Sequence, residues 1–136
     1  MAVVRTKGLN MEDSDLTGTA IGCAMRVHTA LGCGFQEIIY QNALEIEMQK
    51  TTLKFSREYE IPITYDGKKV GSRRVDFLLE DRIPIELKAI VALEDVHIAQ
   101  AKNYLEAFNL RVGLLINFGA KSLEVKRLIN SRAPQK

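Results

Sequence analysis

Residues 75–93 read VDFLLEDRIPIELKAIVAL, two apolar runs separated by the tripeptide Glu80-Asp81-Arg82. Runs that are apolar on both faces are typical of strands in the middle of a sheet. Asp76, Glu86 and Lys88 nevertheless interrupt these runs. Because burying an unpaired charge is costly, the three ionisable side chains need a structural or chemical explanation.

The register of the predicted hairpin supplies one. If residues 80–82 form a three-residue turn, Asp76 lies directly opposite Glu86, and Lys88 shares their face because side chains alternate along a strand. Opposed carboxylates repel each other, and a divalent metal ion held by both, with a lysine beside it, removes the conflict. A two-residue turn would instead place Asp76 and Glu86 on opposite faces. A cross-strand salt bridge at a sheet surface is the alternative interpretation of the three charges.

Outward from this hairpin, the patterns predict one α/β (α+β) domain over residues 1–136 with the order α-α-β-β-β-α-β. Its mixed sheet of about four to five strands is flanked by helices. Flexible ends are expected at 1–12 and 132–136. Apolar spacing and turn signals predict helices over 15–31, 35–50 and 95–109, strands over 55–65, 70–79, 83–91 and 111–118, and a strand or short helix over 122–131.

Composition narrows the classes of protein that fit. The chain has 136 residues with 19 Lys and Arg against 17 Asp and Glu, a net charge of +2, which argues against blanket binding of polyanions. Its two Cys and two His are too few for a disulfide scaffold or a structural zinc site. No apolar run approaches the roughly 18 residues that cross a bilayer, and the start does not resemble a signal peptide. We expect a cytoplasmic protein without a membrane partner.

Three motifs carry a resemblance to a known family. Asp76 followed by Glu86-Leu87-Lys88 resembles the core of the PD-(D/E)xK nuclease superfamily, with Val75 where the name-giving motif has Pro. Residues 34–40, GFQEIIY, resemble the G-x-x-E-x-x-Y signature of its GxxExxY branch. Residues 100–104, QAKNY, resemble the Q-x-x-x-Y motif of RecB-like members. The motifs follow the expected order between about residues 15 and 130, and the resemblance implies a restriction-endonuclease-like core.

The resemblance also implies roles for single residues. Asp76, Glu86 and the carbonyl of Leu87 would bind Mg²⁺ or Mn²⁺, and Glu37 would serve the metal directly or through a water. Lys88 would orient or help deprotonate the attacking water and offset charge in the transition state.

Two residues of the predicted third helix complete the expected catalytic set. Gln100 and Tyr104 are four residues apart and share a helix face, so they could bind the substrate backbone or brace Lys88. In the alternative interpretation, Tyr104 is a core residue.

Basic residues near the Asp66-Gly67 turn are candidates for contact with nucleic acid. Lys68, Lys69 and Arg73 form the clearest local basic patch. By strand alternation, Arg74 shares the face of Asp76 and is expected to meet a phosphate near the metal, whereas Arg73 is expected to point away.

These observations predict a metal-dependent nuclease that hydrolyses phosphodiester bonds of nucleic acid with Mg²⁺, DNA being favoured over RNA. The alternative function is a catalytically silent protein of the nuclease fold that acts as a nucleic-acid-binding or assembly module. The low net charge fits a homodimer or a protein partner that contributes part of the affinity for nucleic acid.

Overall fold

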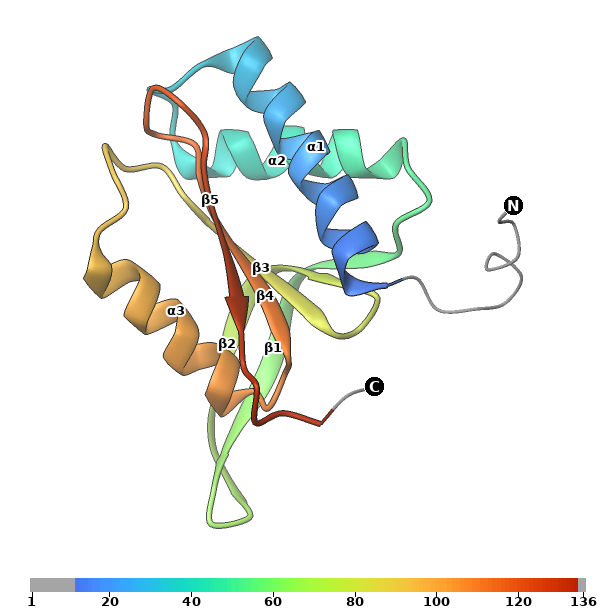
Figure 1. The fold of residues 1–136 in the computed structure, drawn as a ribbon, viewed down its shortest axis with the longest axis vertical. Coiled ribbons are helices and arrows are strands. Elements are labelled where there is room, and N and C mark those ends of the chain that lie inside the picture. Colours follow the sequence, from blue (N-terminus) through green and yellow to red (C-terminus); the bar gives the residue numbers. More distant parts are fainter. Residues whose placement is uncertain (1–11, 135–136) are drawn as a thin grey trace.

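The computed structural model describes residues 12–134 and contains the predicted helices and strands in the predicted order, with a further strand at the end (Figure 1). The elements are α1 (Asp13–Leu31), α2 (Glu37–Gln49), β1 (Phe55–Tyr65), β2 (Lys68–Leu79), β3 (Ile83–Lys88), α3 (Asp95–Ala107), β4 (Val112–Asn117) and β5 (Glu124–Ile129). Most of the expected flexible ends, 1–11 and 135–136, lies outside the described residues. Within those ends, the carbonyl of Glu12 accepts the first bonds of α1, and Ala133 is buried.

The five strands form one mixed sheet with the order β1-β2-β3-β4-β5. Neighbouring strands are antiparallel except β3 and β4, which are parallel and joined through α3. Figure 1 shows α3 apart from α1 and α2, with the sheet between them. The architecture is that of a restriction-endonuclease-like α+β fold.

Each face of the sheet buries its own apolar residues. On one face, α1 and α2 contribute Leu16, Ala24, Tyr40 and Leu44 to the main core, where they meet odd-numbered residues of β2 and β3 such as Phe77 and Ile85. On the other face, Leu105 and Phe108 of α3 and its C-terminal end pack in two smaller clusters. Among the described residues, no helix has the length and apolar character needed to span a membrane.

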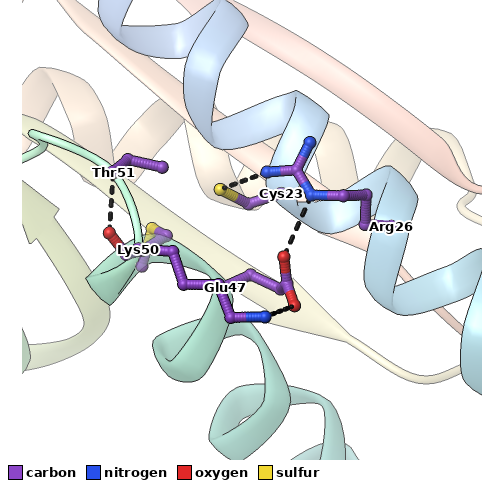
Figure 2. Close-up of polar contacts among 6 residues, drawn as sticks. Cys23, Arg26, Glu47, Lys50 and Thr51 are labelled. Carbon is purple, nitrogen blue, oxygen red and sulfur yellow. Dashed lines mark hydrogen bonds and ion pairs between the residues drawn. The ribbon is translucent and has the colours of Figure 1, made fainter.

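Polar contacts join α1 to α2 (Figure 2). The Nε atom of Arg26 lies 2.9 Å from Oε1 of Glu47, and Lys50 binds the other oxygen of this carboxylate at 3.0 Å. An Nη2–H of Arg26 also donates to the buried Sγ of Cys23 at 3.4 Å. The two helices are therefore fastened together on the outside as well as through the core.

The turn between β2 and β3 has the predicted length. Leu79 pairs with Ile83, so residues 80–82 form a three-residue turn. Glu80 and Asp81 adopt positive φ angles of 49° and 59° to close it. Arg82 then binds Asp13 at 3.0 Å, which ties the turn to the start of α1.

The strand predicted over 83–91 ends at Lys88. The buried side chain of Asn117 accepts from the N–H groups of Ile90 and Gly119 at 2.9 and 3.0 Å and donates to the Ile90 carbonyl at 3.0 Å. A Cβ atom at Gly119 would lie 2.4 Å from the backbone nitrogen of Ile90. The apolar run continues past Lys88, but β4 holds Ile90 by its backbone in a loop, and the chain leaves the sheet there.

Candidate active site

The carboxylate of Asp76 lies where β2 and β3 separate. Regular pairing between these strands ends at Phe77 and Ile85, and the N–H of Leu87 donates to Oδ2 of Asp76 at 2.7 Å. The expectation that Asp76 pairs directly opposite Glu86 is therefore wrong, although the turn register behind it is confirmed. In a continued ladder the N–H of Leu87 would donate to a backbone carbonyl of β2. Here it donates to the side-chain oxygen of Asp76 instead.

Glu86 is a largely buried carboxylate with one oxygen unpaired. Its Oε1 accepts from Nη2 of Arg73 at 3.2 Å, while its buried Oε2 has no hydrogen-bond partner among the described residues. Apolar side chains, among them Pro84, Tyr104 and Phe108, line the adjoining pocket. Burial raises the pKa of Glu86 to about 7, and the charge of Asp76 raises it too, against the opposing effects of Arg73 and Lys88.

Lys88 is the last residue of β3 and is held through its backbone. Its carbonyl accepts from the N–H of Phe118 at 2.8 Å, and it is in register with Asn117 of β4. Its charge lowers the pKa of all three neighbouring carboxyl groups, those of Glu37, Asp76 and Glu86. The predicted lysine therefore lies near the predicted carboxylates.

The G-x-x-E-x-x-Y residues form a structural unit between α1 and α2. Gly34 has a φ of 111°, which a side chain would strain, and the buried Tyr40 closes the loop from the other side. The Tyr40 hydroxyl donates to the Gly32 carbonyl and accepts from the N–H of Phe35 at 3.2 Å. Its ring stacks on Phe118 at 4.8 Å. Tyr40 is therefore a packing residue that fixes where α2 begins.

Glu37 is the first residue of α2 and lies within electrostatic reach of the sheet carboxylates. Desolvation raises the pKa of its carboxyl group, and the charge of Asp76 raises it further, while Lys88 and Arg73 lower it. The pKa of Asp76 is likewise raised by burial, against the bond from Leu87 and the charge of Arg73. Electrostatic influence thus links Glu37 to Asp76, Asp76 to Glu86, and Lys88 to all three carboxyl groups.

Arg73 lies in this site, and the expectation that it points away is wrong. An irregularity lies on the neighbouring strand at Glu58, whose φ is 55° and which is skipped in the pairing opposite Asp76. Arg57, which precedes Glu58, contacts Glu45 of α2 on one face of the sheet. Ile61, which follows Glu58, packs toward α3 on the other face. Regular alternation would place these two odd-numbered residues on the same face. Side-chain alternation therefore reverses at this point.

The same reversal occurs on β2. Phe77 belongs to the core under α1 and α2, whereas Val75 belongs to the cluster under Phe108. Arg73, two residues before Val75, points to the same side of the sheet and contacts Glu86, while Arg74 is exposed and lies 3.8 Å from Glu58. The sequence carries no signal for this irregularity, because its left-handed residue is a glutamate and not a glycine.

The two α3 residues are placed differently from one another. The ring of Tyr104 lies under the Arg73 guanidinium, with Cζ 4.2 Å from the ring centroid, and it packs against the Phe108 cluster. Gln100 is exposed one turn earlier. Tyr104 thus contacts Arg73 as well as the core, and a direct role for Gln100 or Tyr104 toward substrate stays a prediction.

The carboxylates of the site are candidate ligands for a divalent metal. Within residues 12–134, no group of three or more His, Cys, Asp or Glu side chains is arranged to hold a metal ion. Asp76 and Glu86 nevertheless offer hard carboxylate oxygens, and the unpartnered Oε2 of Glu86 is suited to such a cation. The chemistry of these two side chains suits a metal, and ligation by Asp76, Glu86, Glu37 or the Leu87 carbonyl stays a prediction.

The basic residues near the β1–β2 turn lie far along the hairpin. Lys68 and Lys69 are exposed beside its tip, which projects beyond the rest of the sheet (Figure 1). The tip also carries Tyr65 and Val70, which are 76% and 64% exposed. These four side chains at the end of the hairpin are exposed to solvent.

Comparison with known proteins agrees with this fold. The model of the PD-(D/E)XK nuclease superfamily matches residues 14–128, and the chain belongs to that superfamily. Its members usually use divalent metals. The solved structure described as the crystal structure of SSO0001 matches with a TM-score of 0.52 and 21% identity, covering 91% of this chain and 61% of that one. The likeness to SSO0001 concerns the fold, and this chain spans about three-fifths of its length. No curated protein matches the sequence.

Proposed function

We propose that the protein is a divalent-metal-dependent nuclease that hydrolyses phosphodiester bonds of nucleic acid at Asp76, Glu86, Lys88 and Glu37. The observation that carries the proposal is the unpartnered, buried Oε2 of Glu86 beside Asp76 and Lys88 in a chain of this superfamily. Buried carboxylates with raised pKa values are typical of functional sites.

Asp76 and Glu86 would hold Mg²⁺ or Mn²⁺, and Glu37 and the Leu87 carbonyl are further candidate ligands. A metal bound there would supply Lewis-acid activation of a phosphoryl oxygen and of water. Asp76 is oriented by the N–H of Leu87, so its oxygen is fixed before any ligand arrives. The ammonium of Lys88 would orient the attacking water and offset charge on the substrate phosphate.

The proposal extends to the substrate and to the branch of the superfamily. The exposed Lys68, Lys69 and Arg74 would contact the phosphate backbone, with DNA favoured over RNA. The arrangement of Gly34, Glu37 and Tyr40 supports membership of the GxxExxY branch among RecB-like nucleases. A cytoplasmic location and a homodimer or protein partner stay predictions.

Cleavage assays with three variants test this function. Purified protein is incubated with end-labelled duplex DNA, single-stranded DNA and RNA in Mg²⁺, in Mn²⁺ and in EDTA. We expect cleavage with either metal and none in EDTA. Asp76→Asn, Glu86→Gln and Lys88→Met are each expected to reduce the cleavage rate at least about a hundredfold, in the range that removal of a catalytic group produces.

The matched control is Glu106→Gln, which removes an exposed carboxylate of α3 and is expected to cleave like the natural protein. Binding without cleavage under every metal condition would overturn the nuclease proposal. That result would favour the silent nucleic-acid-binding module.

A further inference from the structure

Arg73 is held from two sides. Its Nη2 donates to Oε1 of Glu86 at 3.2 Å, and its Cζ lies 4.2 Å from the ring centroid of Tyr104. The side chains of Arg73 and Glu86 are only 34% and 15% exposed. A planar guanidinium suits this position, because it can stack on a ring face and bind a carboxylate with its edge.

The ring of Tyr104, on which Arg73 stacks, is itself held in place by packing. The Tyr104 ring lies 6.1 Å from that of Phe108 with only 13° between their planes. Phe108 is buried in a cluster with Ile61, Val75 and Leu78. A link therefore runs from the core under α3 through Tyr104 and Arg73 to Glu86.

Arg73 also lies among the carboxylates of the site. Together with Lys88, its charge acts on Glu37, Asp76 and Glu86. Only one oxygen of Glu86 is bound by Arg73, and the other is unpartnered. The guanidinium thus compensates part of the negative charge and leaves one lone-pair site open.

We propose that Arg73 is a positioning residue and resident counter-ion: supported by Tyr104, it holds Glu86 in the metal-free protein, and Glu86 gives up this ion pair when it binds a divalent cation. The inference rests on the proposed metal-dependent function. It assigns Arg73 to the metal site, away from the basic patch of the hairpin tip. It also gives Tyr104 a role at the site that requires the ring and not the hydroxyl.

The proposal has two opposite consequences for an Arg73→Gln variant. The metal-free protein loses the compensation of Glu86, so its melting temperature falls. In titrations at pH 8.5, where protonation of Glu86 does not oppose the cation, divalent cations no longer compete with a guanidinium, so their binding tightens roughly tenfold, as expected when a nearby like charge is removed from a poorly solvated site. A residue that served only to pack the fold would lower the melting temperature without tightening metal binding.

The test is calorimetric titration with Mn²⁺ alone, together with melting temperatures with and without Mn²⁺. The matched control is Arg74→Gln, which removes the same charge one residue along but at an exposed position. We expect the Mn²⁺ dissociation constant to fall roughly tenfold in Arg73→Gln and less than twofold in Arg74→Gln. Saturating Mn²⁺ is expected to restore most of the lost melting temperature of Arg73→Gln.

Two Tyr104 variants test the platform even if Arg73→Gln fails to fold. Tyr104→Phe retains the ring and is expected to bind Mn²⁺ like the natural protein. Tyr104→Leu removes it and is expected to tighten binding roughly threefold, since the guanidinium loses its support.

The possible failures are distinguishable. If the natural protein binds Mn²⁺ but neither Arg73→Gln nor Tyr104→Leu binds it more tightly than Arg74→Gln, the role of Arg73 is overturned and the proposed function stands. If neither the natural protein nor any variant binds Mn²⁺, the metal-dependent function fails and this inference fails with it.

Discussion

Oδ2 of Asp76 accepts a hydrogen bond of 2.7 Å from the backbone N–H of Leu87, at the point where β2 and β3 separate. One carboxylate thus has two tasks, since it completes the backbone bonding of β3 and presents charge to the site. The two tasks can be separated by substitution.

Asp76→Ala removes the acceptor and leaves the N–H of a buried strand residue unpaired. We expect a loss of about 1–3 kcal/mol in the free energy of unfolding. Asp76→Asn keeps an oxygen for this bond, so its unfolding free energy is expected to stay within about 1 kcal/mol of the natural protein. Both variants are expected to lose metal binding and cleavage. Chemical denaturation and Mn²⁺ titration of the pair measure this, and equal destabilisation by both would contradict the structural task.

The raised pKa of Glu86 makes the stability of the metal-free protein depend on pH. The folded chain releases this proton near pH 7, whereas the unfolded chain releases it near 4.5. Between these values the folded state binds more protons, so stability falls as pH rises from about 4.5 to 7. The decrease from this group is about 3 kcal/mol, and the raised pKa values of Glu37 and Asp76 act in the same direction.

Urea denaturation of the natural protein and Glu86→Gln in EDTA at pH 5 and pH 8 measures this effect. Glu86→Gln is expected to lose less stability between the two pH values. The lowered pKa values of Glu47 and Glu124 contribute only at more acidic pH and are common to both proteins. Mn²⁺ binding to the natural protein is expected to weaken below pH 7, because the cation competes with the proton. Parallel pH profiles for the two proteins would contradict the assignment.

Gly119 and Gly18 form a contrasting pair of glycines. A Cβ at Gly119 would lie 2.4 Å from the backbone of Ile90, whereas a Cβ at Gly18, in the middle of α1, meets nothing within 4 Å. We expect Gly119→Ala to destabilise the protein by at least about 2 kcal/mol through forced movement of the loop after Lys88. Gly18→Ala is expected to stabilise it by about 0.5–1 kcal/mol through helix propensity. Thermal or urea unfolding checks both, and a neutral Gly119→Ala would mean that the loop yields easily.

The exposed lysines of the hairpin tip are expected to contribute to the salt dependence of nucleic-acid binding. Replacing Lys68 and Lys69 with Ala removes two exposed cations, and each phosphate contact contributes about 0.9 to the slope of log K against log salt on B-form DNA. We expect weaker binding to all duplex sequences and a slope smaller by up to about 2. Fluorescence anisotropy in a salt series, with Glu86→Gln as the background to prevent cleavage, measures it. An unchanged slope would remove the tip from the binding surface.

Much of the candidate site could be proposed from sequence because it depends on local rules. The turn of residues 80–82 fixed the register, and charges inside apolar strands indicated Asp76, Glu86 and Lys88. Two features depended on distant parts of the chain instead. The end of β3 at Lys88 is set by the backbone bonds of Asn117 to Ile90, and the direction of Arg73 goes with its contacts to Glu86 and Tyr104, beside a glutamate with positive φ on the neighbouring strand. Neither feature can be predicted from the residues next to Lys88 or Arg73 in the sequence.

The irregularity at Glu58 has a consequence for comparing this chain with its relatives. Because alternation reverses at Asp76, the odd-numbered residues of β2 face α3 before Asp76 and face α1 and α2 after it. An alignment that transfers residue roles along this strand by parity would give the wrong answer on one side of Asp76. Relatives that lack the irregularity would present the residue aligned with Arg74, not the one aligned with Arg73, to the buried glutamate. Candidate counter-ions in this superfamily should therefore be identified from side-chain positions in structures and not from the columns of a sequence alignment.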